Sequence, residues 1–262
     1  MFYGVSGIIS YDNVEEFMEK LEKYRGLKKG VVFAPDTNVL YHRFISNFRP
    51  LDNYEIVIAE PVKNEIEQAM NYKYKKETLR ELEKIAKRPG LLREFYNRRI
   101  KKSRKAAYIA LQEFESLKDR IIVAEKSGEG HNDDEIIVKT LKKFDEISPA
   151  LLVFLTADVA ATDVAEFEGL EYFLFHYPQK DLGKHFIHPS NLRTLIFNLS
   201  AVFGVIALEN VLVFGEFAGK RKLGELKVVF ERGSSREMAF HLNLSRKLME
   251  IQKTLRQESG HV

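Results

Sequence analysis

The stretch Val31-Val32-Phe33-Ala34-Pro35-Asp36-Thr37-Asn38-Val39-Leu40 decides the fold of this chain. Its first four residues form a short apolar run without polar alternation, which indicates a strand buried on both faces. Pro35 ends the run, and Asp36 lies where a helix over residues 37–48 is expected to begin. Asp36 is therefore either the N-cap of that helix or a side chain placed for function, and the stretch alone favours neither.

Four further apolar runs, bounded by turn or helix-start residues, are expected to form strands. Helix-spaced apolar segments separate them, so strands and helices alternate over residues 31–176. This alternation predicts an α/β fold, a three-layer α/β/α arrangement with a central parallel sheet covered on both faces. The four expected strands are residues 55–59, 120–124, 151–155 and 172–175.

The expected organisation has three parts. Residues 1–30 form an N-terminal helical extension, residues 31–180 the α/β domain, and residues 185–262 a small C-terminal α+β region. The domain carries a basic helical insertion at about 72–118, within two long helices expected over 60–88 and 91–118 and separated by Pro89-Gly90.

The C-terminal region is expected to begin with an apolar helix over 190–206 and to end with a helix that carries an apolar stripe. Strand-like segments at 211–217 and 226–230 flank a basic turn at 219–222, which is expected either to be a solvated hairpin tip or to contact RNA. The two helices either cover the sheet or form a dimer interface.

Composition excludes several classes of protein. The chain has 262 residues, of which 45% are hydrophobic and 30% charged, so we expect a globular protein. It has no cysteine, which excludes disulfides and thiolate metal sites. No apolar run reaches the roughly 18 residues that span a bilayer, and no secretory leader is visible, so a cytoplasmic location without a membrane partner is expected. The absence of cysteine beside abundant Lys, Arg and Glu favours a thermophilic source.

Positive charge is concentrated in the insertion. Residues 73–105 contain 14 Lys and Arg against 4 Glu, a local net charge of +10 in a chain whose formal charge is +3. Such a patch attracts a phosphate backbone, although a solvated helical face has the same composition. Four tyrosines in and beside it, Tyr72, Tyr74, Tyr96 and Tyr108, either stack on bases or pack internally. The candidate RNA-binding residues are Lys75, Lys76, Arg98, Arg99, Lys101, Lys102 and Arg104.

Acidic residues follow each of the first four expected strands. In a parallel sheet these positions share one edge, where clustered carboxylates repel one another unless a divalent cation joins them. Hard cations such as Mg²⁺ and Mn²⁺ prefer such oxygen ligands. Asp133 lies in line with an apolar helical face and is preferred over its neighbour Asp134, although the choice stays open. The candidate ligands are Asp36, Glu65, Asp133 and Asp158, with Asp134 and Asp163 as further possibilities.

Four segments resemble the acidic motifs of PIN domains. The quoted stretch around Asp36-Thr37-Asn38 is similar to the family's opening motif, and Thr156-Ala157-Asp158 is similar to its last. The segments Pro61–Ile66, containing Glu65, and Asn132–Ile137, containing Asp133, resemble the second and third. The resemblance covers about residues 31–177, whereas the basic insertion and the C-terminal region depart from it.

The resemblance implies a Mg²⁺- or Mn²⁺-dependent phosphodiesterase that acts on RNA and leaves a 5′-phosphate and a 3′-hydroxyl. By position, Asp36, Glu65, Asp133 and Asp158 match the family's catalytic acids and metal ligands. Asn38 and Thr156 match supporting polar residues. The resemblance also implies self-association, with a homodimer expected.

Two alternatives belong to other classes. A PIN-like module that binds RNA or a protein without cutting would retain the same acids. A haloacid-dehalogenase-type phosphatase needs a second Asp two positions after the first, and position 38 is Asn. The chain also lacks the Gly-x-x-x-x-Gly-Lys segment of P-loop enzymes and the nucleophile elbow of α/β hydrolases.

Overall fold

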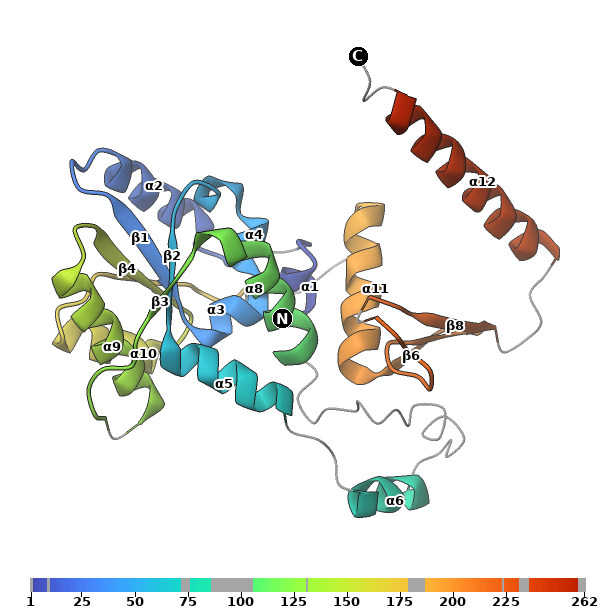
Figure 1. Ribbon diagram of the computed structural model, residues 1–262, viewed down its shortest axis with the longest axis horizontal. Helices are drawn as coiled ribbons and strands as arrows, with labels where there is room; N and C mark the ends of the chain where they lie inside the picture. The colour runs from blue at the N-terminus through green and yellow to red at the C-terminus, as the bar shows by residue number, and fades with distance from the viewer. Residues whose placement is uncertain are drawn as a thin grey trace.

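A five-stranded parallel sheet in the order β3-β2-β1-β4-β5 forms the centre of the molecule (Figure 1). The predicted α/β class and the predicted parallel sheet are confirmed. The computed structural model describes residues 2–8, 10–71, 76–85, 106–130, 132–178, 187–222, 224–230 and 236–258. The strands of this sheet are β1 Val31–Pro35, β2 Ile56–Ala59, β3 Ile121–Ala124, β4 Leu151–Thr156 and β5 Tyr172–Leu174.

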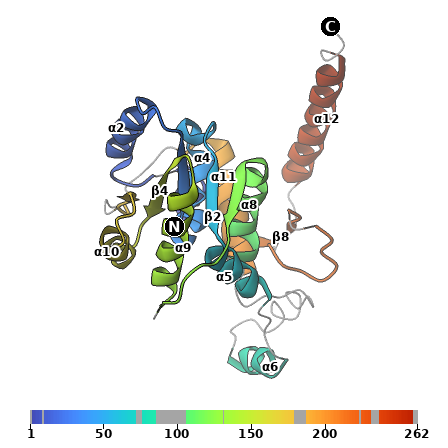
Figure 2. The same ribbon diagram turned by 60° about the vertical axis from the view of Figure 1, so that its left-hand side comes forward.

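Helices cover both faces of the sheet (Figures 1 and 2). On one face α5, α9 and α10 pack against the strands and against one another, whereas α2 and α3 lie on the other face. The helices of this part are α1 Phe2–Val5, α2 Val14–Arg25, α3 Thr37–His42, α4 Phe44–Asn47, α5 Glu60–Asn71, α6 Lys76–Ile85, α8 Leu111–Leu117, α9 Asp133–Ile147 and α10 Val159–Phe167, with short 3₁₀ turns at Arg49–Leu51 and Lys118–Arg120 and a π-helical turn at Ala106–Ala110.

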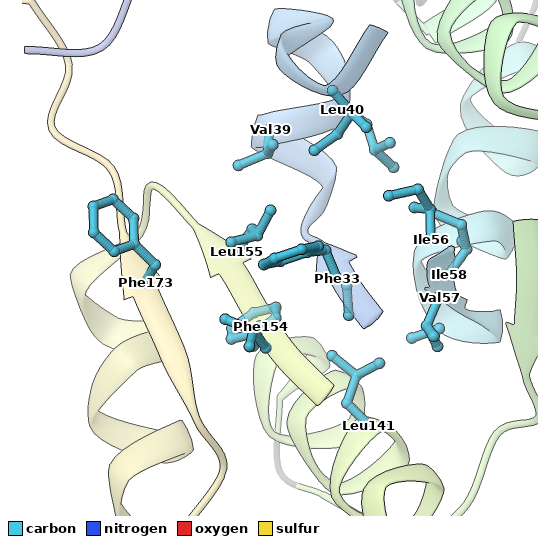
Figure 3. Close-up of a cluster of buried hydrophobic side chains, with 14 of the residues drawn as sticks. Phe33, Val39, Leu40, Ile56, Val57, Ile58, Leu141, Phe154, Leu155 and Phe173 are labelled. Carbon is cyan, nitrogen blue, oxygen red and sulfur yellow. The ribbon is translucent and has the colours of Figure 1, made fainter. Parts of the chain in front are cut away.

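Side chains on both faces of the strands are buried, which explains the unbroken apolar runs in the sequence. Phe33 of β1 is fully buried and its ring contacts that of Phe17 of α2 at 6.0 Å between centroids. Phe173 of β5 contacts the same ring at 4.9 Å, so α2 packs across the first and last strands. Figure 3 shows the strand side chains in one buried cluster with residues of α3 and α9.

The helix predicted over residues 37–48 is interrupted at Arg43. This residue has a φ of 52°, in the left-handed region, and it separates α3 from α4. Its guanidinium lies 3.4 Å from the carboxylate of Glu113, which is fully buried on α8. Glu113 also accepts a hydrogen bond of 2.9 Å from the backbone N–H of Ser46. These contacts compensate for a backbone conformation that costs a non-glycine residue about 1 kcal/mol or more.

The C-terminal region differs from prediction in its strands. The helix expected over 190–206 ends at Phe203, because Gly204 turns the chain with a φ of 86°. The next residues form the strand β6, whose first two residues, Val205 and Ile206, were predicted to belong to the helix. The result is an antiparallel sheet in the order β6-β7-β8. The elements are α11 Pro189–Phe203, β6 Val205–Leu208, β7 Val211–Phe214, β8 Lys227–Phe230 and α12 Arg236–Glu258.

Lys220 is buried, so the prediction of a solvated or RNA-contacting basic turn is wrong at this residue. Its ammonium donates a hydrogen bond of 2.9 Å to the Tyr108 hydroxyl and another to the Gly215 carbonyl. It also lies 3.6 Å from the carboxylate of Glu216. Tyr108 is 4% exposed. Of the two expectations for this residue, base stacking and internal packing, the structure therefore agrees with packing. Tyr72, Tyr74 and Tyr96 lie outside the described residues.

The last helix, α12, stands apart from the rest of the molecule in both views (Figures 1 and 2). Its apolar side chains are largely exposed, with Phe240 at 63% and Leu248 at 57%. The predicted apolar stripe therefore does not cover the sheet. Across the described ranges, none of the helices combines the length and the apolar character needed to span a membrane.

Candidate functional site

Asp36 lies at the carboxyl end of β1, beside the carboxyl end of β4. The strand order reverses between β1 and β4, and ligands of open α/β sheets bind outside this reversal point. The side chain of Asp36 is 7% exposed. One carboxylate oxygen accepts a 2.6 Å hydrogen bond from the N–H of Val39, so Asp36 is also the N-cap of α3. The predicted N-cap role of Asp36 is therefore confirmed, and its functional role stays a prediction.

The second carboxylate oxygen of Asp36 faces β4. It accepts a hydrogen bond of 2.5 Å from the Thr156 hydroxyl and one of 3.4 Å from the Ala157 N–H. Burial nevertheless raises the pKa of Asp36 from 3.8 to about 6, because these hydrogen bonds offset only part of the lost hydration. The negative charge of Asp158 raises this pKa further. The site thus holds a carboxylate whose ionised form lacks sufficient compensation from the protein.

Asp158 follows β4 and caps α10. Its carboxylate accepts a 2.9 Å hydrogen bond from the N–H of Ala160. Its own N–H donates to the Thr156 hydroxyl at 3.0 Å, and that hydroxyl donates to Asp36. Thr156 is fully buried and so fixes the two acidic segments relative to each other. The supporting role expected for Thr156 in a metal site stays a prediction.

The third acidic segment opens α9, and Asn132 caps it by accepting a 2.8 Å hydrogen bond from the N–H of Glu135. Asp133 is exposed, whereas Asp134 is half-buried. The pKa of Asp134 is raised first by burial, then by the charge of Asp158 and then by that of Asp133. The structure therefore brings Asp134 electrostatically close to Asp158, while Asp133 points more toward solvent.

Glu65 lies on α5 at the outer side of the site. It is exposed, but it accepts a 2.7 Å hydrogen bond from the Thr37 hydroxyl, one residue after Asp36. Burial raises the pKa of Tyr41 to about 12, and the charge of Glu65 contributes to that rise. Glu65 is therefore held beside α3 by its own partners.

Asn38 and Asp163 are less closely connected to the acids. Asn38 is half-buried in the first turn of α3, and Asp163 is exposed on α10. Within the described part of the chain, neither shows a hydrogen bond to another candidate residue. The supporting role predicted for Asn38 and the possible ligand role of Asp163 stay predictions.

Two tyrosines at this edge were missed by the sequence analysis. Burial raises the pKa of Tyr177, and the charges of Asp36 and Asp158 raise it further. Burial also raises the pKa of Tyr11, followed by contributions from Tyr177 and Asp36. Tyr177 lies three residues after the end of β5, so a survey of all polar residues near strand ends would have found it. Nothing in the local sequence of Tyr11 indicates its place here.

The donor set has the chemistry of a divalent-cation site. The candidate ligands are carboxylates, and burial, followed by mutual repulsion, raises the pKa of two of them, Asp36 and Asp134. As the side chains are placed, no three Asp, Glu or His residues among those described lie close enough together to hold an ion. Asp36 and Asp134 are therefore electrostatic neighbours of Asp158 without forming a ligand set as they are placed.

The basic residues expected to bind RNA cannot be placed beside the acids. Lys75, Arg98, Arg99, Lys101, Lys102 and Arg104 lie outside the described residues. Lys76 is the first residue of α6. Their role stays a prediction.

Comparison with known proteins supports the α/β fold. A search of curated proteins gives no match. The family model described as PIN domain matches residues 33–175, from within β1 to just after β5, a range that includes all of the acidic segments. The C-terminal region is not covered by a family model. PIN domains have a nuclease-type fold, and the chain belongs to the PIN-domain family.

Proposed function

We propose that this protein is a divalent-metal-dependent ribonuclease, with Asp36, Asp158 and Asp134 as its principal metal ligands. The observation that carries the proposal is the buried, poorly compensated carboxylate of Asp36 at the reversal point of the sheet. Keeping such a group ionised at neutral pH lowers stability unless a cation is bound. Mg²⁺ or Mn²⁺ at these carboxylates would supply Lewis-acid activation of water and of the phosphodiester.

The surrounding residues position the acids. The Thr156 hydroxyl donates a hydrogen bond to the Asp36 carboxylate and accepts one from the Asp158 backbone N–H. Both acidic residues are thereby held at fixed positions relative to the sheet. Thr37 holds Glu65 at the outer side of the site, where it adds negative charge without being buried. In metal sites, hydrogen bonds from neighbouring residues commonly fix the orientation of the ligating side chains, and Thr156 and Thr37 would act in this way here.

Asp134 is proposed in place of Asp133, the residue that the sequence favoured. Asp134 is the half-buried member of the pair, and its pKa responds to Asp158. Asp133 is exposed and contributes to the site through its charge. Replacing each by Asn tests the choice. We expect Asp134→Asn to lower kcat/KM by at least about tenfold and Asp133→Asn to change it less; the opposite order would return the assignment to Asp133.

The function itself is tested with Asp36→Asn on the full chain and a single-stranded RNA. With Mn²⁺ present, kcat/KM is expected to fall by at least about 100-fold. Asp52→Asn is the matched control, because Asp52 is an exposed residue before β2, at the opposite edge of the sheet. Equal cleavage by both variants would show that Asp36 is not a ligand.

A non-cutting RNA-binding module is the second candidate. It is favoured by the absence, among the described side chains, of three acids placed to hold an ion. Calorimetric titration with Mn²⁺ beside the cleavage assay separates the two functions. Metal binding that requires Asp36 together with turnover supports the nuclease, whereas RNA binding without turnover under any divalent metal supports the module.

A further inference from the structure

The π-helical turn Ala106–Ala110 is shared between the PIN domain and the C-terminal region. It contacts α3, α5 and α8 of the domain and also α11, which Figure 1 shows beside the chain that leads into α8. Two of the contacted helices belong to the acidic site, because Asp36 caps α3 and α5 carries Glu65. π-helical turns are rare and frequently lie at functional sites. This turn therefore connects the C-terminal region to helices of the acidic site.

Tyr108 of the turn is enclosed by residues of the C-terminal region. Ala201 and Phe197 of α11 pack against it. The ammonium of Lys220 lies 4.6 Å from the centroid of its ring and donates a hydrogen bond of 2.9 Å to its hydroxyl. Tyr108 is 4% exposed and Lys220 is 6% exposed, so both groups have left water. The contact between them is a buried one across the two parts of the chain.

The other partners of Lys220 come from the C-terminal region itself. Its ammonium donates a hydrogen bond to the Gly215 carbonyl and lies 3.6 Å from the Glu216 carboxylate. Gly215 packs directly on α11, since a Cβ at this position would lie only 2.2 Å from the carbonyl oxygen of Ser200. A larger residue would thus push this segment away from α11. Lys220 is therefore held within the C-terminal region and presents its charge to Tyr108.

The ion pair between Lys220 and Glu216 is a poor source of stability. Glu216 is 3% exposed, and its second carboxylate oxygen makes no hydrogen bond with any of the described residues. The lost hydration of two buried charges offsets most of their attraction unless all of their hydrogen bonds are made. Apolar side chains of similar size would hold the two parts together at least as well. The pair is better explained by the specific position that it gives to Tyr108.

The basic insertion returns to the PIN domain at this turn. Its last candidate RNA-binding residue, Arg104, precedes Tyr108 by four residues in the sequence. Four residues span at most about 14 Å, so anchoring Tyr108 limits where the end of the insertion can lie. Lys220 itself is buried and has no access to a phosphate group. Any effect of Lys220 on RNA binding must therefore act through other residues.

We propose that Lys220 is a positioning residue for RNA binding. Held by Glu216, it fixes the π-helical turn through Tyr108 and so orients the basic insertion toward a strand at the acidic site. The C-terminal region thereby contributes to substrate binding through a contact that is remote from the RNA. This inference rests on the proposed ribonuclease function, and only on its RNA-binding step.

The test replaces the ion pair by neutral side chains of similar size, Lys220→Met together with Glu216→Gln. The formal net charge of the chain stays the same, so the double variant does not alter long-range attraction of RNA. Fluorescence anisotropy in EDTA measures the affinity of the full chain for a labelled oligouridine at several salt concentrations. Each phosphate contact contributes about 0.7 to the slope of log affinity against log salt concentration for a single strand.

The double variant is expected to bind the oligouridine about tenfold more weakly and to show a slope lower by about 1, the loss of one or two phosphate contacts. Partial unfolding would reduce the fraction of active protein and leave the slope unchanged. Arg25→Met with Glu22→Gln is the matched control, because it also preserves the net charge but removes an exposed ion pair on α2. An unchanged slope in the Lys220 and Glu216 variant would overturn the inference.

A milder substitution covers the case in which the double variant does not fold. Tyr108→Phe keeps the ring and the ion pair and removes only the hydroxyl that accepts from Lys220. It should lower the slope in the same direction, and an unchanged slope would again contradict the positioning role.

Neutralising the insertion shows whether it is the part that Lys220 positions. Lys101→Gln, Lys102→Gln and Arg104→Gln together should lower the slope of the wild-type protein by about 2. The same three changes should lower it by less when Tyr108→Phe or the double variant is already present, because some of these contacts have then been lost. Equal reductions in both backgrounds would overturn the inference.

Cleavage of the same RNA with Mn²⁺ separates this inference from the proposed function. A slope that depends on Lys220 and Glu216, in a protein that cleaves RNA with no divalent metal, would retain the positioning role and reject the nuclease. Metal-dependent cleavage by a protein whose slope is independent of this pair would reject the positioning role alone.

Discussion

Replacing Asp36 by Asn should make the metal-free protein more stable at neutral pH and less stable in acid. The pKa of Asp36 is about 6 in the folded protein against 3.8 for an unperturbed carboxyl. The folded state therefore binds this proton more tightly than the unfolded state. Stability from the protonated form is fully present below pH 3.8 and is lost as the pH rises through about 6. A difference of about 2 in pKa corresponds to about 3 kcal/mol in the free energy of unfolding at pH 8.

Hydrogen bonding works in the opposite direction. The Asp36 carboxylate accepts from Val39, Thr156 and Ala157, and an amide in its place can accept through only one oxygen. The loss should lower stability by about 1–2 kcal/mol at every pH. Asp36→Asn is therefore expected to be about 1 kcal/mol less stable than wild type at pH 4 and about 1–2 kcal/mol more stable at pH 8.

Urea denaturation in EDTA from pH 4 to pH 8 measures this directly. The difference between Asp36→Asn and wild type should change by about 2–3 kcal/mol over the range. For Asp52→Asn the difference should stay nearly constant, because Asp52 is exposed. Saturating Mn²⁺ should then stabilise wild type, by about 2.7 kcal/mol at 100 times Kd, and stabilise Asp36→Asn much less. A difference that does not vary with pH would refute the argument that burial of this carboxylate creates the demand for a cation.

Three further changes test other parts of the structure. Thr156→Val removes the hydroxyl that joins two acidic segments, so urea denaturation should show a loss of about 1–3 kcal/mol, and calorimetry a weaker affinity for Mn²⁺; unchanged metal affinity would contradict the positioning role. Glu113→Ala removes the buried carboxylate that accepts from the Arg43 guanidinium and from the Ser46 N–H. It should cost about 3 kcal/mol or more in the same assay, whereas a loss below about 1 kcal/mol would show that the pair is dispensable. Deletion of residues 236–262, which include the exposed α12, should leave the melting temperature of the remaining chain nearly unchanged. A clear decrease would indicate packing or assembly through this helix. Sedimentation of the full and the shortened chain tests the expected dimer.

The parts of the fold that could be predicted from sequence are those fixed by local pattern. Double burial of parallel strands leaves unbroken apolar runs, and β1 and β4 were located from such runs with boundaries within one residue. The acids at the strand ends followed from the sheet direction, because consecutive parallel strands end at one edge. The position of Asp36 beside Asp158 therefore needed no knowledge of distant contacts.

The parts that could not be predicted depend on contacts between distant segments. Arg43 interrupts a helical pattern, and its ion-pair partner Glu113 lies 70 residues away. The local sequence therefore gave no sign of the interruption. β6 continues the apolar run of α11, and only the positive φ of Gly204 separates helix from strand. The choice between Asp133 and Asp134 depends on how α9 is rotated against Asp158, which a helical spacing alone does not specify.

The packing of α2 against β5 has a consequence for how the chain folds during synthesis. Asn13, just before α2, donates a 2.8 Å hydrogen bond to the carbonyl of Leu174, 161 residues later. Lys20 donates to the carbonyl of Tyr172, and Phe17 packs on Phe173. At about 5–20 residues per second, a ribosome needs roughly 10–30 seconds to add the intervening chain.

During that interval the apolar face of α2, with Phe17 and Leu21, has no native partner in β5. Contacts of such large sequence separation slow folding, because the loop must close before they contribute. Helix α2 is thus synthesised long before the strand on which it docks, and its exposed apolar face would offer a point of contact for a chaperone. Closure of α2 onto β5 is therefore expected to be the slow step that completes the PIN domain.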